Sequence, residues 1–273
     1  MKIFIDSADL EEIKQGYDWG VADGVTTNPS LLKKAVEKRI AGGESLDLTA
    51  YITQILEVAK GTPVSLEVTK TTAEGMIAQG NKLYELFNPI ADNVYVKVPV
   101  NPAFKDDDST HFDGIIAIRA LTEAGIPINS TLIFTPEQAM LAAKAGAAFV
   151  SPFAGRIDDD LRKNAGMNFD KTDYFPAEGM AVDDRFLDDN GIYSGIDMVE
   201  QCVQIIDEYG FETEVLAASL RNPRQVRESA LVGAHIATLP FGVIRDMLKH
   251  HKTFEGMAKF TADSVPEYVE LIK

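Results

Sequence analysis

The segment INSTLIFTPEQAMLAAKAGAAFVSPF, residues 128–153, contains one full period of the pattern that runs through this chain. It begins with an apolar run, Ile128–Phe134, continues with an amphipathic stretch, Pro136–Ala145, and returns to an apolar run, Ala147–Phe153. Short and nearly continuous apolar runs are typical of strands that are buried on both faces of a parallel sheet. The segment therefore predicts a strand, a crossover helix and a second parallel strand.

The same alternation extends from this segment toward both ends of the chain. Eight apolar runs predict strands at Lys2–Asp6, Gly24–Asn28, Val64–Val68, Val94–Val100, Ile128–Phe134, Ala147–Phe153, Glu214–Ser219 and His235–Pro240. Helical patterns between them include Ser7–Tyr17, Asp47–Lys60, Thr72–Phe87, Phe112–Ala124, Pro136–Ala145, Ile196–Tyr209 and Pro223–Val232. Eight is the number of parallel strands that closes a (β/α)8 TIM barrel. An open doubly wound sheet is the alternative, but no Gly-x-Gly-x-x-Gly turn follows the first strand.

The length of the chain, 273 residues, suits a single TIM-barrel domain over residues 1–273. Two polar stretches interrupt the alternation, Asn101–His111 and the much longer Arg156–Ser194. Both follow the carboxyl ends of predicted strands, where barrel enzymes place their sites. We therefore expect a long loop insertion at about 157–194, and a helical segment at about 251–273 after the last strand.

The formal net charge of −16 and the sequence pI of about 4.6 argue against binding to nucleic acid or to an anionic membrane surface. An anionic substrate would need a local patch of arginines or helix N-termini.

The single cysteine, Cys202, excludes an internal disulfide and favours a reducing compartment, and its helical surroundings predict a packed core thiol. No apolar stretch approaches the roughly 20 residues that span a bilayer. We expect a soluble cytoplasmic protein.

Lys97 carries the strongest chemical signal, because it lies among valines in Val94-Tyr-Val-Lys-Val-Pro-Val100, a predicted core strand. Lysines are rarely buried without a reason, and desolvation favours the neutral amine of a lysine, which can attack a carbonyl and form an imine. A core ion pair, or a side chain that reaches out of the barrel end, is the alternative. Lys70 is the rival lysine, in a turn where an exposed amine is expected.

Other polar residues lie at or near strand ends, namely Asp6, Asn28, Glu67, Asn129, Thr131 and Ser151. Asp6 could instead cap the helix that follows it, although Ser7 and Asp9 compete for that role. Glu67 and Lys97 could simply neutralise each other in the core. A group of polar side chains that converges on one barrel mouth nevertheless predicts a site for a polyhydroxylated ligand.

Seven segments of the sequence resemble the transaldolase family, especially its short microbial branch, which also includes fructose-6-phosphate aldolase. They are Phe4–Asp9, Gly24–Leu32, Glu67 with Thr71–Met76, Val94–Val100, Asn129–Phe134, Ala143–Asp159 and Val215–Pro223. They occur in the order that the family has, which makes the combination specific although each segment alone is weak. The resemblance implies a (β/α)8 barrel enzyme that needs no metal and no cofactor.

The resemblance also implies roles for individual residues. Lys97 is expected to form a Schiff base with a ketose phosphate, and Asp6 to move the proton of the C4 hydroxyl. Glu67 and Thr131 are expected to handle the water of imine formation and hydrolysis. Hydroxyls of the bound dihydroxyacetone unit are assigned to Asn28, Asn129 and Ser151. The phosphate is assigned to Arg156, Ser219 and Arg221, whose arginines match phosphate oxygens in geometry and charge. Pairing with Asp158 or Asp159 is the alternative for Arg156.

Two positions distinguish branches of the family. Fructose-6-phosphate aldolases resemble this chain but carry glutamine at the Glu67 position and tyrosine at the Phe134 position, so a transaldolase of the pentose phosphate pathway is expected here. A lyase that releases dihydroxyacetone, or a sugar-phosphate-binding barrel without catalysis, is the alternative.

The histidines show no metal-ligand spacing, and the acidic run Asp106–Asp108 is interpreted as a solvated loop. The C-terminal region of short relatives docks on a neighbouring subunit, and this chain matches the family only loosely from His251 to Lys273. A homo-oligomer is expected, with a dimer, a pentamer and a decamer left open.

Overall fold

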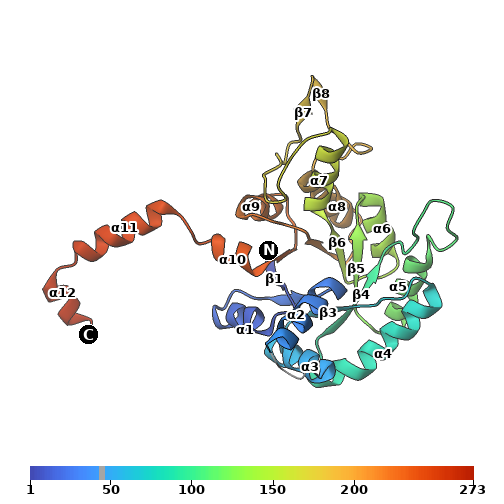
Figure 1. Ribbon diagram of the computed structural model, residues 1–273, viewed down its shortest axis with the longest axis horizontal. Coiled ribbons are helices and arrows are strands. Elements are labelled where there is room, and N and C mark those ends of the chain that lie inside the picture. Colours follow the sequence, from blue (N-terminus) through green and yellow to red (C-terminus); the bar gives the residue numbers. More distant parts are fainter. Residues whose placement is uncertain (43–46) are drawn as a thin grey trace.

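Eight parallel strands form a closed barrel in the computed structural model, which describes residues 1–42 and 47–273 (Figure 1). The strands are β1 (Lys2–Asp6), β2 (Gly24–Thr26), β3 (Val64–Glu67), β4 (Val94–Pro99), β5 (Ile128–Ile133), β6 (Phe149–Pro152), β9 (Glu214–Ala217) and β10 (Ile236–Leu239). The last strand, β10, pairs with β1 and closes the ring. The predicted (β/α)8 TIM barrel is confirmed, and the predicted strands are correct to within a few residues at their ends.

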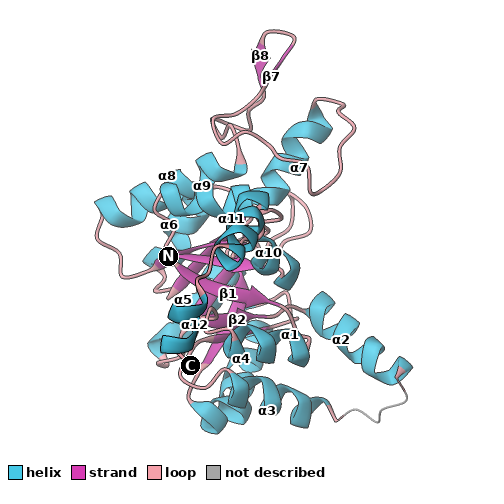
Figure 2. Cartoon of the chain, turned by 90° about the vertical axis from the view of Figure 1, so that its left-hand side faces the viewer, coloured by secondary structure: helices cyan, strands magenta, loops and turns pink. Residues whose placement is uncertain are grey.

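Helices surround this barrel on its outer face (Figure 2). They are α1 (Leu10–Asp18), α2 (Pro29–Ala41), α3 (Leu48–Val58), α4 (Ala73–Ala91), α5 (Asp113–Glu123), α6 (Pro136–Lys144), α8 (Gly195–Glu208) and α9 (Pro223–Leu231). Several begin at a side chain that caps the first free N–H groups, as Thr135 does for α6 and Asn222 for α9. The sequence pattern does not single out α2, because Ala35 is the only buried residue that anchors it.

Helix α7 (Ala154–Asn164) occupies the first part of the stretch for which the sequence predicts a long loop, at about 157–194. Its sequence is dense in charge, but Ile157 and Leu161 lie one turn apart and are buried. The long loop therefore begins after Asn164 instead. It contains a small antiparallel hairpin, β7 (Ala181–Val182) and β8 (Arg185–Phe186), which projects away from the barrel in Figure 1.

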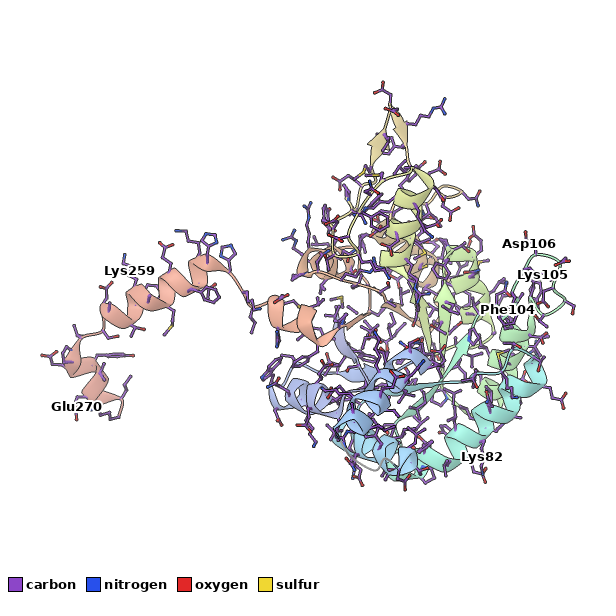
Figure 3. The ribbon with its side chains drawn as sticks, viewed as in Figure 1. Lys82, Phe104, Lys105, Asp106, Lys259 and Glu270 are labelled. Carbon is purple, nitrogen blue, oxygen red and sulfur yellow. The ribbon has the colours of Figure 1, made fainter. Side chains whose placement is uncertain are left out.

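The C-terminal part of the chain leaves the barrel as an extended arm. After α10 (Phe241–Asp246), helices α11 (His251–Ala262) and α12 (Pro266–Leu271) have no buried residue. Figure 3 shows the arm standing away from the barrel, with Lys259 and Glu270 labelled on it. Across residues 1–42 and 47–273, no helix combines the length and apolar character that a bilayer crossing requires.

Two layers of side chains make up the core. Outward-facing strand residues such as Val25, Val96 and Val150 are buried against the helices. Inside the barrel, a separate cluster is built around Phe4, Phe149, Leu216, Ala218 and Ile236. Within it, Tyr95 stacks on Phe149 with ring centroids 4.7 Å apart, and such an aromatic pair contributes about 0.5–1.5 kcal/mol beyond burial.

An ion pair lies at the end of the barrel where the strands begin. Lys2 Nζ lies 2.8 Å from each carboxylate oxygen of Glu214. The aromatic and aliphatic cluster follows one level further along the strands. Since inward-facing residues recur at every second position, the next inward level lies at the carboxyl ends of the strands, and there the inward side chains are polar. The site thus has an apolar floor and opens toward the strand ends.

Candidate active site

Strand register brings three of the predicted residues to one level inside the barrel. Glu67 on β3 pairs with Lys97 on β4, and Lys97 pairs with Asn129 on β5. Next to β3 in the ring, Thr26 on β2 pairs with Asp6 on β1. Paired residues of a parallel ladder project to the same face, so these side chains share the barrel interior.

The Lys97 amine lies inside the barrel and not among the surrounding helices. The residue is 5% exposed, and its Nζ lies 3.3 Å from Glu67 Oε2 and 3.3 Å from the Thr27 carbonyl oxygen. The core ion pair that the sequence left open is therefore present. It coexists with an inward amine at the edge of a cavity, so it does not remove the chemical signal. Lys70, the rival lysine, is exposed.

Two carboxyl groups are affected by this one amine, Glu67 by direct pairing and Asp6 through its charge. Burial raises the pKa of Asp6, against the opposing effects of the Lys97 charge and of a hydrogen bond from Thr26 Oγ1 at 2.8 Å. Burial likewise raises the pKa of Glu67, again opposed by Lys97, with Asp6 adding a smaller increase. Desolvation thus makes both carboxyls better proton acceptors than ordinary surface carboxyls, which is the property that acid–base catalysis requires.

Hydroxyl and amide groups form a chain across the barrel. Ser151 Oγ donates to Asn129 Oδ1 at 2.6 Å, and Asn129 Nδ2 donates to Ser65 Oγ at 3.0 Å. The Thr131 hydroxyl is buried and has no hydrogen-bond partner within the described residues. An unpaired buried hydroxyl is costly, so its presence here is typical of a functional site.

Asn28 has a structural task as well as a place in the site. Its Oδ1 accepts from Leu31 N at 3.0 Å and so caps α2. The side-chain NH2 group is the part that remains for a ligand.

These residues line a cavity of about 110 Å³ at the carboxyl ends of the strands. Its walls are Asp6, Thr26, Asn28, Lys97, Ser151, Phe153, Arg156, Leu216, Ala218, Ser219 and Thr238. Six of the ten predicted site residues are among them: Asp6, Asn28, Lys97, Ser151, Arg156 and Ser219. Glu67 and Asn129 are connected to this wall by their contacts with Lys97 and Ser151. Thr131 and Arg221 do not line the cavity.

The predicted phosphate residues lie on the first turn of α7 and on the loop after β9. Arg156 is exposed on the first turn of α7, with its guanidinium carbon 4.9 Å from the centre of the Phe153 ring. Ser219, after β9, has φ of 63°, a left-handed conformation that is uncommon for a residue with a side chain and is often found at functional sites. The Arg221 guanidinium lies against Gly155, since a Cβ on that glycine would be 3.2 Å from Arg221 Nε.

Asp158 and Asp159, which the sequence offers as alternative partners of Arg156, bind other residues. Asp159 pairs with Arg221 and not with Arg156. Asp158 accepts from the Gly195 backbone N–H and from Gln225. Arg156 therefore remains free of both neighbouring carboxylates among the described contacts.

Sequence reasoning missed Thr26, Thr238, Phe153, Leu216 and Ala218 as wall residues. For Thr26, the sequence contains a signal that would have placed it in the site. Thr26 precedes Asn28 by two positions, and so it faces the same side of the strand. Thr26 and Thr238 hydroxyls lie 2.5 Å apart and join β2 to β10 across β1.

Metal-ligating clusters of three or more His, Cys, Asp or Glu residues are absent from residues 1–42 and 47–273. In the acidic run Asp106–Asp108, Lys105 pairs with Asp107 at 2.9 Å, on a loop at the rim of the molecule where Figure 3 labels Phe104, Lys105 and Asp106. Cys202 is fully buried in the core, and burial raises the pKa of its thiol to about 12. This thiol is therefore not a nucleophile.

Known proteins resemble this chain along almost its whole length. The family model described as Transaldolase/Fructose-6-phosphate aldolase matches residues 3–271. A "Probable transaldolase" of Chlorobium phaeobacteroides (strain DSM 266 / SMG 266 / 2430) is 45% identical over 268 residues, covering 97% of this chain and 96% of that protein. Proteins with the same name from Desulfatibacillum aliphaticivorans and Aquifex aeolicus (strain VF5) are 42% identical, with coverage of 96% and 97%, and 40% identical, with coverage of 98% and 99%.

Proposed function

We propose that this chain, which belongs to the transaldolase/fructose-6-phosphate aldolase family, is a transaldolase that transfers a dihydroxyacetone unit between sugar phosphates. The family membership that seven sequence segments predict is confirmed by the match over residues 3–271. The single observation that carries the proposed chemistry is the inward amine of Lys97, 5% exposed, at the wall of a polar cavity. Binding of a sugar phosphate alone does not require such an amine.

Lys97 is the proposed Schiff-base residue. Its neutral amine attacks the C2 ketone of the donor, and loss of water leaves a cationic imine. The imine then accepts the electrons of the C3–C4 bond as an aldose phosphate departs. The remaining three-carbon enamine attacks an acceptor aldehyde, and hydrolysis of the imine releases the new ketose. The iminium is the electron sink throughout these steps, so the proposed mechanism assigns no step to a metal or an organic cofactor.

Asp6 and Glu67 are proposed to move the protons. Asp6 takes the proton of the C4 hydroxyl as the bond breaks, and returns it to the new hydroxyl when the acceptor adds. Glu67 lies 3.3 Å from the Lys97 amine, and so it is close to the carbon where water leaves and re-enters. The Thr131 hydroxyl is assigned to the same water. Burial raises the pKa of both carboxyls, which supports these assignments.

The remaining residues are proposed to hold the two ends of the donor. Asn28, Asn129 and Ser151 bind hydroxyls of the three-carbon unit. Asn28 and Ser151 line the same cavity as Lys97, and Asn129 bonds Ser151 at the level of Lys97. Arg156, Ser219 and Arg221 bind the phosphate. A chain with a formal net charge of −16 repels anions at long range, so a local pair of arginines is the feature that allows a phosphorylated substrate to bind.

Reductive trapping tests the central assignment. We expect borohydride to trap an adduct between a ketose phosphate and the native chain, and Lys97→Ala to abolish it. Peptide mapping by mass spectrometry should place the added mass on residues 94–100. Lys70→Ala is the matched control, since Lys70 is exposed and its loss should leave trapping unchanged. An adduct that persists after the Lys97 substitution would exclude this residue as the imine lysine.

Acceptor dependence separates the transferase from the lyase. A transaldolase should stall after one turnover without an acceptor such as glyceraldehyde 3-phosphate or erythrose 4-phosphate. Continuous release of dihydroxyacetone without an acceptor would favour the fructose-6-phosphate aldolase activity instead. Glu67 and Phe134 favour the transferase, since the aldolases that resemble this chain carry glutamine and tyrosine there. A chain that binds the donor but forms no adduct would be a non-catalytic sugar-phosphate-binding barrel.

The cellular setting is proposed on chemical grounds. Donor and acceptor of this reaction are sugar phosphates of the pentose phosphate pathway, and a lone buried thiol suits a reducing cytoplasm. We also propose a homo-oligomer, in which the arm formed by α11 and α12 packs on another copy of the chain. The arm exposes large apolar side chains, including Phe254, Met257 and Phe260, which are 61%, 65% and 72% exposed.

A further inference from the structure

Arg221 is held by a carboxylate that the proposed chemistry does not use. Its Nη1 donates to Asp159 Oδ1 at 2.5 Å, and its Nη2 donates to Asp159 Oδ2 at 2.7 Å. The two side chains are only 16% and 18% exposed. A bidentate pair of this kind fixes both the position and the rotation of the guanidinium plane.

The long loop after α7 supplies a second contact. The Lys171 carbonyl accepts a hydrogen bond from Arg221 Nη1 at 3.1 Å. This part of the loop is anchored on α9 through Tyr174, whose hydroxyl donates to Glu228 at 2.8 Å. The Arg224 guanidinium carbon lies 3.5 Å from the centre of the same ring, in cation–π geometry. The loop therefore contacts Arg221 from a fixed position.

Some N–H groups of Arg221 already have an acceptor, and the others lie along one edge of the guanidinium. A guanidinium has five N–H groups. Asp159 takes one from each Nη, and Lys171 takes the other one of Nη1. The Nε–H and the second N–H of Nη2 are left, and within the described residues no acceptor contacts Nε. These two N–H groups lie along one edge of the plane, which is an arrangement that binds two phosphate oxygens at once.

The position of Arg221 is fixed relative to the first turn of α7. A Cβ atom on Gly155 would lie 3.2 Å from Arg221 Nε and 3.3 Å from its Cζ, so the guanidinium lies directly over this glycine. Arg156, which lines the cavity, is the next residue of the same turn. The Arg221 guanidinium thus covers the residue that directly precedes Arg156 in the chain.

We infer that Asp159 and the Lys171 carbonyl are positioning groups for substrate phosphate. They occupy the outer donors of Arg221 and leave its Nε–Nη2 edge oriented for bidentate contact. An unheld arginine would have to lose its rotamer freedom when the ligand binds, whereas a held one has already lost it. The inference rests on the proposed function only for its assignment of phosphate to Arg156, Ser219 and Arg221. It assigns to the loop after Asn164 a role in positioning Arg221.

A competing effect makes the inference testable. Removal of the Asp159 carboxylate adds positive charge near the phosphate, which by Coulomb attraction alone would tighten binding. The positioning role requires the opposite result. Asp160 provides the matched control, because it is the next residue of α7, carries the same charge, is exposed, and bonds Asn164 instead of Arg221.

The experiment measures inorganic phosphate binding to the full chain by calorimetry, together with steady-state kinetics. For Asp159→Ala we expect the phosphate Kd and the KM for a phosphorylated donor to rise about 10-fold, the loss of one charge-assisted hydrogen bond. The value of kcat should change less than about 2-fold, because the reacting carbons are untouched. Asp159→Asn should give a smaller rise, and Asp160→Ala no more than about a 2-fold change. Unchanged or tighter phosphate binding by both Asp159 variants would overturn the inference.

The loop contact is tested separately. Tyr174→Ala removes the anchor on α9 and should raise the phosphate Kd by about 3-fold, whereas Phe186→Ala, on the projecting hairpin, should leave it unchanged. Equal Kd values for these two variants would remove the loop from the inference. Because phosphate binding needs no Schiff base, these comparisons stand even if the native chain forms no trappable adduct. The absence of a trappable adduct would overturn the proposed function alone.

Discussion

The Asp158 carboxyl is 2% exposed and joins three helices of the barrel's outer layer. From α7 it accepts the Gly195 N–H of α8 at 2.7 Å and the Gln225 Nε2 of α9 at 2.9 Å. Gln225 in turn accepts the backbone N–H of Arg221 through its Oε1, so its amide orientation is set. Burial raises the pKa of Asp158 to about 6, above its ordinary value of 3.8, and the hydrogen bond from Gly195 and the charge of Arg162 oppose this rise.

The raised pKa predicts how stability depends on pH. Between pH 3.8 and about 6 the unfolded chain has released this proton and the folded chain retains it, so stability falls as pH rises. A shift of about 2 units corresponds to roughly 3 kcal/mol. We therefore expect the unfolding free energy of the native chain, minus that of Asp158→Asn, to decrease by about 2 kcal/mol from pH 4 to pH 7, since this interval covers most but not all of the transition. Urea unfolding at several pH values measures it. A difference that is constant or increases with pH would contradict the prediction.

The close contact between α7 and the loop after β9 depends on one glycine. A Cβ on Gly155 would lie 2.2 Å from the Ser219 carbonyl oxygen, well inside any permitted contact. Backbone can approach backbone here because Gly155 has no side chain. The contact places the turn that carries Arg156 against the loop that carries Ser219 and Arg221. The two halves of the proposed phosphate site are thus assembled by the packing of two elements.

Gly155→Ala should separate these two elements. We expect a loss of about 1–3 kcal/mol in unfolding free energy, since backbone atoms must shift to admit the methyl group. Gly242→Ala in α10 is the control, because nothing lies within 4 Å of its added Cβ. Alanine is the better helix former, so this control should stabilise the chain by up to about 1 kcal/mol. Urea denaturation measures both, and equal effects of the two substitutions would show that the contact does not constrain α7.

The molecule as a whole consists of a closed barrel and an arm that makes no buried contact of its own. The side chains of α11 and α12 are exposed, and Val265, Tyr268, Leu271 and Ile272 extend the apolar surface beyond Phe254, Met257 and Phe260. Helices as short as these are marginal in water without tertiary packing. The arm therefore gains stability if another copy of the chain covers it, which is the basis of the proposed homo-oligomer.

Charge substitutions on the arm test this assembly. Phe254→Glu combined with Phe260→Glu places two carboxylates on the apolar side of α11. We expect light scattering to report the 29.8 kDa monomer for this variant and a larger mass for the native chain. Lys259→Glu, on the other side of the helix, is the control and should leave the oligomer intact. A native chain that is monomeric at micromolar concentration would contradict the proposal.

Much of this protein follows from local patterns in its sequence. Apolar runs alternate with amphipathic stretches, and each strand places every second residue inward, so both the barrel and the inward lysine are predictable from the sequence alone. Prediction fails where the local pattern is weak. The α7 segment resembles a loop in sequence because charge outnumbers its two large buried aliphatic side chains, Ile157 and Leu161. Helix α2 does not stand out because Ala35 alone is buried in it.

The sequence by itself determined the barrel, the family and the residue types of the site. The barrel depends on the periodicity of apolar residues, and the family and the site residues depend on motifs that are short contiguous segments. Tertiary structure decided which acid pairs with which base. Asp159 lies three positions from Arg156 and 62 from Arg221, yet it binds Arg221, because α7 and the loop after β9 pack together. Partner choice between distant segments depends on packing in three dimensions, which sequence spacing does not encode.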